Sequence, residues 1–153
     1  MGMEIERKFL VCNAPFEKWD EGIEITQGYL ARGQQATARV RTFGAQGFMT
    51  IKGKTTGISR QEFEYEIPYE DAQALLLLCE GSLIIKRRWQ VKVGAHIWEI
   101  DRFEGENLGL IVAEIELSSE NEPFTKPEWV GIEVSDDPRY FNGALSRTPY
   151  QDW

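Results

Sequence analysis

The chain has 153 residues, of which 42% are hydrophobic and 27% are charged, a composition typical of one globular domain with its own core. Its net charge of −8 argues against non-specific binding to nucleic acid or to anionic membranes. Two cysteines and one histidine argue against a disulfide framework or a zinc site. The charged N-terminus lacks the apolar stretch of a signal peptide, so we expect residues 1–153 to form a single cytoplasmic domain.

Segments in which apolar and polar residues alternate follow one another along most of the chain. The alternation predicts eight strands, over residues 3–11, 24–32, 36–43, 47–54, 60–68, 83–93, 96–103 and 110–118. Short stretches of turn residues separate these segments. Strands at this close spacing predict a mainly β fold, an antiparallel meander that is either open or closed into a barrel.

Two segments depart from the alternation and predict helices. In residues 69–80, apolar residues such as Ala72, Leu76 and Cys79 recur at helical spacing after two acidic residues in the first turn. Residues 136–146 begin with two acidic residues and a proline close to the first helical position. This second pattern predicts a short C-terminal helix.

Charged residues of one sign recur on one face of the predicted strands, because residues two apart along a strand point to the same side of a sheet. The acidic residues that share faces in this way are Glu4, Glu6, Glu62, Glu64, Glu66, Glu99, Asp101, Glu114 and Glu116. The basic residues are Lys8, Arg39, Arg41, Lys52, Lys54, Arg60, Lys86 and Arg88. Apolar residues occupy the opposite face of most of these strands.

Separate acidic and basic clusters suit a polyanion with bound divalent metal ions, because the basic residues can bind the anion and the acidic residues can bind the metal ions. Carboxylate oxygens are ligands for Mg²⁺ or Mn²⁺, and lysine and arginine bind phosphate oxygens. The alternative is an ordinary solvated sheet face. Such faces tend to mix the two signs between neighbouring positions, whereas this sequence separates them strand by strand.

The order of these residues resembles the CYTH, or triphosphate tunnel metalloenzyme, superfamily. The opening Glu4-Ile5-Glu6-Arg7-Lys8 is similar to the ExExK signature of that superfamily. Further matches follow in the same order, at residues 27–30, 39–41, 52, 60–64, 86–88, 99–101, 114–116 and 129–142. The resemblance implies an eight-stranded antiparallel β-barrel that forms a charged tunnel, with a few helices outside it and a C-terminal helix closing one end.

The resemblance also implies a role for each matched position. The expected metal ligands, for one or two Mg²⁺ or Mn²⁺ ions, are Glu4, Glu6, Glu62, Glu64, Asp101, Glu114 and Glu116. The expected phosphate ligands are Lys8, Arg39, Arg41, Lys52, Lys86 and Arg88. Lys8, Tyr29 and Lys86 are the expected catalytic groups, with Tyr29 either assisting proton transfer beside Lys86 or only hydrogen-bonded at the edge of the tunnel. The outward residues expected to pack against the helix at residues 69–80 are Phe63, Tyr65, Ile85, Trp89 and Trp98.

The expected activity is metal-dependent hydrolysis of inorganic tripolyphosphate to pyrophosphate and phosphate. Alternatives are hydrolysis of nucleoside or thiamine triphosphate, a class IV-like adenylate cyclase, and a sensor that binds polyphosphate or nucleotide without turnover. A barrel for apolar ligands, of the lipocalin type, is disfavoured by the charged inner face. The expected partner is a small triphosphate, without nucleic acid or membrane, for a chain that is a monomer or a homodimer.

Overall fold

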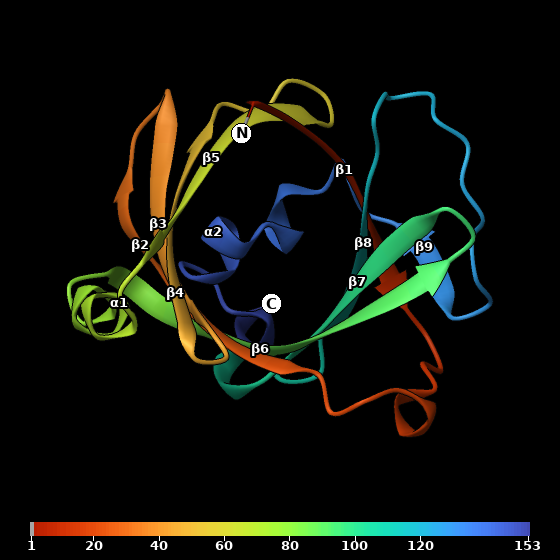
Figure 1. The fold of residues 1–153 in the computed structure, drawn as a ribbon, viewed down its shortest axis with the longest axis horizontal. Coiled ribbons are helices and arrows are strands. Elements are labelled where there is room, and N and C mark those ends of the chain that lie inside the picture. Colours follow the sequence, from red (N-terminus) through yellow and green to blue (C-terminus); the bar gives the residue numbers. More distant parts are fainter. Residues whose placement is uncertain (1) are drawn as a thin grey trace.

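Eight strands close into an antiparallel barrel in the computed structural model, which describes residues 2–153 (Figure 1). The strands are β1 (Gly2–Val11), β2 (Ile23–Arg32), β3 (Ala36–Phe43), β4 (Gln46–Gly53), β5 (Ser59–Ile67), β6 (Glu80–Val93), β7 (His96–Phe103) and β8 (Ile111–Glu116). Around the barrel they run β1, β5, β4, β3, β2, β6, β7 and β8, and β8 pairs with β1 again. The predicted eight-stranded barrel is confirmed.

The hairpins that join β3 to β4 and β6 to β7 set the register of these pairs. Gly44 and Gly94 begin the two turns, with φ of 59° and 62°, a region that only glycine enters without strain. The flanking residues pair directly, Phe43 with Gln46 and Val93 with His96. Every second residue of these strands faces the interior of the barrel, which we call the lumen. The register set at the turn decides which of the two alternate sets of residues this is.

A ninth strand, β9 (Val130–Glu133), was not predicted. It pairs with the second half of β1, with Phe9 opposite Glu133 and Val11 opposite Val130. Four residues are too few to show an alternation of period two, so only the tertiary structure identifies this strand. Its position brings the following C-terminal segment, residues 135–153, back to the barrel.

The helices are shorter than the sequence predicts. Helix α1 (Tyr69–Leu76) ends in a turn at Leu77, before the predicted end at residue 80. The predicted helix at residues 136–146 is divided into η3 (Pro138–Tyr140) and α2 (Asn142–Leu145) by Phe141, whose ψ of 139° is extended. Further 3₁₀ turns are η1 (Phe16–Lys18), η2 (Gly105–Asn107) and η4 (Tyr150–Asp152). The extended Phe141 lets α2 lie within the ring of strands (Figure 1).

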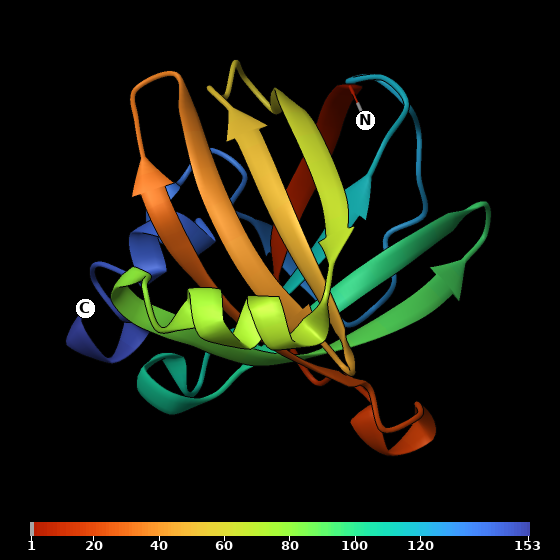
Figure 2. The same ribbon diagram turned by 60° about the vertical axis from the view of Figure 1, so that its left-hand side comes forward.

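Helix α1 covers only one side of the barrel (Figure 2). It packs on β2, β3 and β4, where Ala72 and Leu76 meet the buried Val40. The prediction that Trp89 and Trp98 pack against this helix is wrong. They belong to a separate core with Phe9, which lies under residues 124–130 rather than under α1.

Three other residues of that prediction take different environments. Tyr65 and Ile85 are exposed, and Phe63 is half-buried outside the three apolar cores of the described chain. The alternation correctly placed them on the outer face, but it could not specify which part of the outer face is covered. None of the helices described within residues 2–153 has the length and apolar character needed to cross a membrane.

The close contact of α1 with β4 allows a test of the fold. A Cβ atom on Gly47 would lie 2.7 Å from Ala72 Cβ and 3.1 Å from the Ile67 carbonyl oxygen. We therefore expect Gly47→Ala to destabilise the protein by about 1–3 kcal/mol through overpacking, measured by urea unfolding. Gly53→Ala, on the same strand with no atom closer than 3.5 Å, is the matched control and should change stability little. Equal effects of the two substitutions would contradict this account of the α1 contact.

Candidate active site

The lumen contains a cavity of about 1110 Å³ lined by the inward faces of the strands and by the C-terminal segment. All of the site residues predicted from the sequence line it except Asp101. Lining residues outside that set include Arg32, Arg60, Glu99, Ser135, Asn142 and Arg147. The residues that the sequence places on the inner face of each strand therefore line one common cavity, with few exceptions.

Carboxylates gather where β7, β8 and β1 are neighbours. Glu6 lies directly opposite Glu116, and Glu99 lies directly opposite Glu114. Glu4 follows on the same face of β1 and is buried. Like charges facing each other in a sheet are destabilising unless a cation or a proton lies between them.

Protonation relieves part of this repulsion at Glu6. Burial, together with the neighbouring Glu114 and Glu4, raises the pKa of Glu6 well above its ordinary value. Burial also acts to raise the pKa of Glu114, but Lys8 and a hydrogen bond from Glu6 hold it well below its ordinary value. Burial, Glu4 and Glu62 raise the pKa of Glu116. Burial and neighbouring carboxylates therefore both disfavour the charged forms of Glu6 and Glu116.

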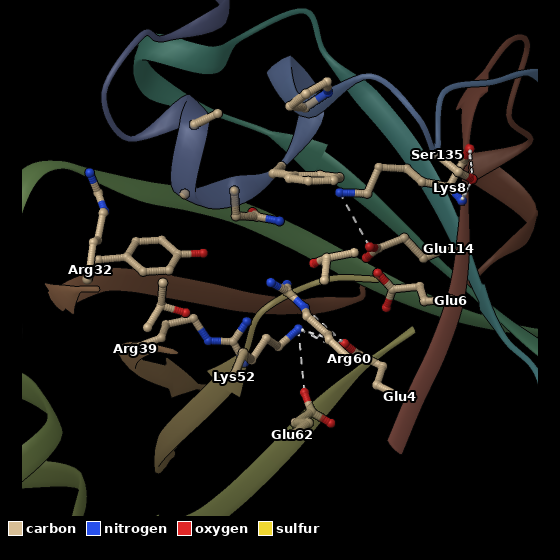
Figure 3. Close-up of a pocket in the computed structure, with 18 of the residues that line it drawn as sticks. Glu4, Glu6, Lys8, Arg32, Arg39, Lys52, Arg60, Glu62, Glu114 and Ser135 are labelled. Atoms are coloured by element: carbon tan, nitrogen blue, oxygen red, sulfur yellow. Dashed lines mark hydrogen bonds and ion pairs between the residues drawn. The ribbon is translucent and has the colours of Figure 1, made fainter. Parts of the chain in front are cut away.

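Ion pairs join acidic and basic residues of nearby strands on the inner wall of the barrel (Figure 3). Lys52 Nζ lies 3.2 Å from Glu4 Oε1 and 3.5 Å from Glu62 Oε2, and Arg60 Nε lies 3.6 Å from the same Glu4 oxygen. Lys8 Nζ lies 3.4 Å from Glu114 Oε2. These bases and carboxylates hold each other in the interior of the barrel.

Arg39 and Arg41 share a second set of contacts around Glu64. Arg41 Nη2 lies 3.2 Å and Arg39 Nη2 lies 3.7 Å from Glu64 Oε2, and Thr50 Oγ1 donates to the same oxygen at 2.9 Å. Burial and the neighbouring Arg39 lower the pKa of Arg41 to about 10. Two guanidinium groups held this close are a suitable partner for an anion with more than one negative charge.

The deepest charged group is a triad formed by Lys86, Asp101 and Arg88. Arg88 binds Asp101 through two hydrogen bonds of 2.7 and 2.9 Å, and Lys86 Nζ lies 2.8 Å from Asp101 Oδ2. Burial raises the pKa of Asp101 but Arg88 and Lys86 lower it further, to about 2. Burial and Arg88 lower the pKa of Lys86 to about 8, although Asp101 opposes them. Asp101 is 1% exposed, both of its oxygens are paired, and it is absent from the residues that line the cavity.

The C-terminal segment completes the wall of the cavity. Lys8 Nζ donates to the Tyr140 carbonyl oxygen at 3.0 Å, and Lys86 Nζ donates to Asn142 Oδ1 at 3.1 Å. Ser135 Oγ accepts a hydrogen bond from the Lys8 backbone N–H at 2.9 Å (Figure 3). These contacts join residues more than 50 positions apart, so no local pattern in the sequence could have predicted them.

Tyr29 lines the cavity and is buried, as predicted for an inward residue of β2. The Arg32 guanidinium carbon lies 4.9 Å from the centre of its ring, and Arg32 also hydrogen-bonds Ser146. Among residues 2–153 no hydrogen bond links Tyr29 with Lys86. Their joint role in proton transfer stays a prediction.

The donor set of the cavity fits a divalent cation. Within the described part of the chain, no three carboxylate, histidine or cysteine side chains are already arranged around a metal position. The carboxylates contact lysine, arginine and each other instead, and burial together with the neighbouring Glu114 and Glu4 raises the pKa of Glu6. Hard oxygen ligands with excess negative charge are the donors that Mg²⁺ and Mn²⁺ prefer.

Known proteins match this chain over nearly its whole length. A family model described as the CYTH domain matches residues 2–141. An inorganic triphosphatase of Acetivibrio thermocellus is 46% identical over 154 residues, with 100% of this chain and 99% of the relative covered. An inorganic triphosphatase of Nitrosomonas europaea is 37% identical over 147 residues, with 94% and 96% covered.

Solved structures are similar in the same way. The crystal structure of an inorganic triphosphatase superposes with a TM-score of 0.68 at 35% identity, covering 95% of each chain. A putative adenylate cyclase from Bacillus halodurans superposes with a TM-score of 0.59, covering 78% of this chain and 84% of that chain. The latter is only 18% identical, so it bears on the fold and not on the reaction.

Proposed function

The chain belongs to the CYTH domain family, and from this membership we infer that it hydrolyses inorganic triphosphate to pyrophosphate and phosphate in the lumen of its barrel. The family resemblance predicted from the ordered motifs is confirmed. The observation that carries the function is the match over the whole chain to an inorganic triphosphatase at 46% identity. The cavity, with basic and acidic side chains facing one another, supports the same conclusion.

Triphosphatases of this family depend on a metal ion, and we propose that here it is Mg²⁺ or Mn²⁺. The carboxylates proposed to hold it line the cavity, and they are Glu4, Glu6, Glu62, Glu64, Glu114 and Glu116. A bound ion of this kind neutralises phosphate charge and lowers the pKa of a water ligand. Asp101 is left out of the set because it does not line the cavity.

The basic residues are proposed to bind the phosphates. Arg39 and Arg41 from β3 and Lys52 from β4 present adjacent cations on one wall, and Lys8 from β1 faces them. Arg88 is fixed by two hydrogen bonds to Asp101, so its orientation is set before substrate arrives. Cations held in place in the cavity stabilise the charge that develops on the leaving pyrophosphate.

Lys86 is proposed to take part in proton transfer together with Tyr29. Its pKa of about 8 allows the neutral amine to form near physiological pH, where it can accept a proton from the Tyr29 hydroxyl or from a lumen water. We therefore expect kcat/KM to fall roughly tenfold per pH unit below about pH 8, because protonation of Lys86 removes the acceptor. The measurement is a pH–rate profile from pH 6 to 9.5, at saturating metal.

The Lys86→Met variant tests whether Lys86 causes the fall in kcat/KM below about pH 8. Its kcat/KM at high pH should be about tenfold lower than that of the wild type, and kcat/KM should no longer begin to fall near pH 8. If the variant keeps the wild-type fall in kcat/KM below pH 8, another group titrates there.

The experiment for the function is a substrate panel with and without metal. Phosphate release is measured from tripolyphosphate, pyrophosphate, ATP, GTP and thiamine triphosphate, with Mg²⁺, Mn²⁺ or a chelator, and cyclic AMP is followed in parallel. We expect release to be fastest with tripolyphosphate and to disappear with the chelator. Preference for an organic triphosphate, formation of cyclic AMP, or tight binding without turnover would each replace the proposed function by the corresponding alternative.

A further inference from the structure

Three consecutive positions of the C-terminal segment contact the inner face of the barrel beside Lys86. Asn142 Oδ1 accepts a hydrogen bond from Lys86 Nζ at 3.1 Å. Gly143 lies against Tyr29, since a Cβ atom on this glycine would be 3.7 Å from Tyr29 Cζ and 3.9 Å from its hydroxyl oxygen. Ala144 lines the same cavity. Helix α2 is therefore in contact with both groups proposed for proton transfer.

Lys86 Nζ is held from two sides. Asp101 Oδ2, on β7, lies 2.8 Å from it, and Asn142 Oδ1, on α2, lies 3.1 Å from it. An ammonium group has three N–H donors, so one remains for a ligand in the lumen. The side chain is 1% exposed, which leaves no solvent to replace either acceptor. Loss of Asn142 would leave Asp101 as the one acceptor that orients this amine.

The amide of Asn142 has no structural task in its own helix. Residue 142 is the first residue of α2 after Phe141, and no side chain caps this helix by a hydrogen bond. The helix is anchored instead by Leu145, which is fully buried with Ile84 and Phe103. Among the side-chain hydrogen bonds of residues 2–153, the Asn142 side chain takes part only in the one that Lys86 Nζ donates.

We propose that Asn142 is a positioning residue, which together with Asp101 fixes the amine of Lys86 for turnover and so makes the C-terminal segment part of the active site. The proposal rests on the proposed function for its effect on turnover. It assigns to α2 a role beyond closing one end of the barrel. Lys8 provides an internal comparison, because the same segment holds it through the Tyr140 backbone carbonyl and not through Asn142.

The test compares Asn142→Leu, which removes the acceptor at similar volume, with Asn142→Asp, which keeps an oxygen in the same place. We expect Asn142→Leu to lower kcat for tripolyphosphate about tenfold, the effect of one lost hydrogen bond to a charged group, with KM changed less than about threefold. At high pH, Asn142→Asp should retain kcat within about threefold of the wild type, and its fall in activity at low pH should begin at a higher pH because the added carboxylate raises the pKa of Lys86. Equal losses in the two variants would overturn the proposal.

A second readout follows Lys86 without any substrate. Each protein is treated briefly with an acylating reagent, and the extent of modification of each lysine is measured by peptide mass spectrometry. In Asn142→Leu, Lys86 should react about tenfold faster than in the wild type, while Lys8 keeps its wild-type rate. Unchanged protection of Lys86, or exposure of Lys8 as well, would overturn the proposal, the second result because it indicates that the whole segment has detached.

The two readouts separate the inference from the proposed function. An inactive wild-type protein on the substrate panel contradicts the triphosphatase assignment, whereas the acylation pattern still reports on the contact between Asn142 and Lys86. A wild-type enzyme that is active, with Asn142→Leu equally active, contradicts the positioning role alone.

Discussion

Replacing Glu6 with glutamine is expected to lower metal-dependent turnover of tripolyphosphate at least about 100-fold while making the metal-free protein more stable. Glu6 lies in the lumen opposite Glu116, and Glu114 and Glu4 are its acidic neighbours. Glutamine keeps the shape of the protonated side chain but removes the negative charge. The loss of a carboxylate ligand lowers activity, and the same loss removes repulsion from the acidic cluster.

The sign of the stability change follows from the raised pKa of Glu6. A carboxyl group whose pKa is higher in the folded than in the unfolded state contributes stability at pH values below 4.5, and this contribution is lost as pH rises through the folded pKa. At pH 8 the contribution of Glu6 therefore destabilises the metal-free barrel relative to low pH. We expect Glu6→Gln to raise the melting temperature in chelator by about 3 °C, or about 1 kcal/mol, at pH 8, and by less at pH 5.

A matched control is Glu66→Gln, because Glu66 lies on β5 but does not line the cavity. This substitution should leave both turnover and melting temperature close to the wild-type values. If Glu6→Gln lost activity together with its fold, the residue would be structural and the proposed metal set would be wrong. Retained activity in Glu6→Gln would exclude Glu6 from that set.

Replacing Arg88 with methionine is expected to give the largest combined loss of stability and activity. Arg88 makes both hydrogen bonds to Asp101, which is 1% exposed, and it lies 3.3 Å from Glu99 and 3.7 Å from Glu114. Lys86 would still pair with Asp101, but Asp101 would lose its two-hydrogen-bond partner inside the protein, at a cost of about 3 kcal/mol. We expect the melting temperature to fall by roughly 10 °C and kcat/KM for tripolyphosphate to fall more than about 100-fold.

The double variant Arg88→Met/Asp101→Asn separates these two effects. It removes the Asp101 charge that has lost Arg88, although it also removes the partner of Lys86, so we expect it to recover at most about half of the lost stability and none of the lost activity. Arg87→Met, on the neighbouring outward position of β6, is the control and should cost less than about 1 kcal/mol. Recovery of activity in the double variant would show that Arg88 supports the fold and does not bind phosphate.

Local pattern was sufficient to predict the strands and most of the charged inner surface, whereas closure into a barrel was predicted from the family resemblance. The alternation of β1 places Glu4, Glu6 and Lys8 on one face whatever the strand pairs with, because the side-chain period of a strand is a local property. The same holds for Lys86 and Arg88 on β6. These residues line the cavity as predicted.

The pairing between strands was decided by the tertiary structure. That Glu6 faces Glu116, and Glu99 faces Glu114, depends on the register of β1, β7 and β8, which residues far apart in sequence determine together. Asp101 shows the consequence most clearly. It lies on the same face of β7 as Glu99, yet Arg88 and Lys86 enclose it behind the cavity wall.

Sequence by itself determined the family, the eight strands and the charged character of the lumen, because each depends on residue types at short and regular spacings. Only the tertiary structure placed Trp98 under residues 124–130 and not under α1, and brought Asn142 to Lys86 across 56 positions. Contacts of this kind are made by irregular segments whose path depends on packing against the completed barrel. They carry no periodic signal, so no reading of the local sequence could have predicted them.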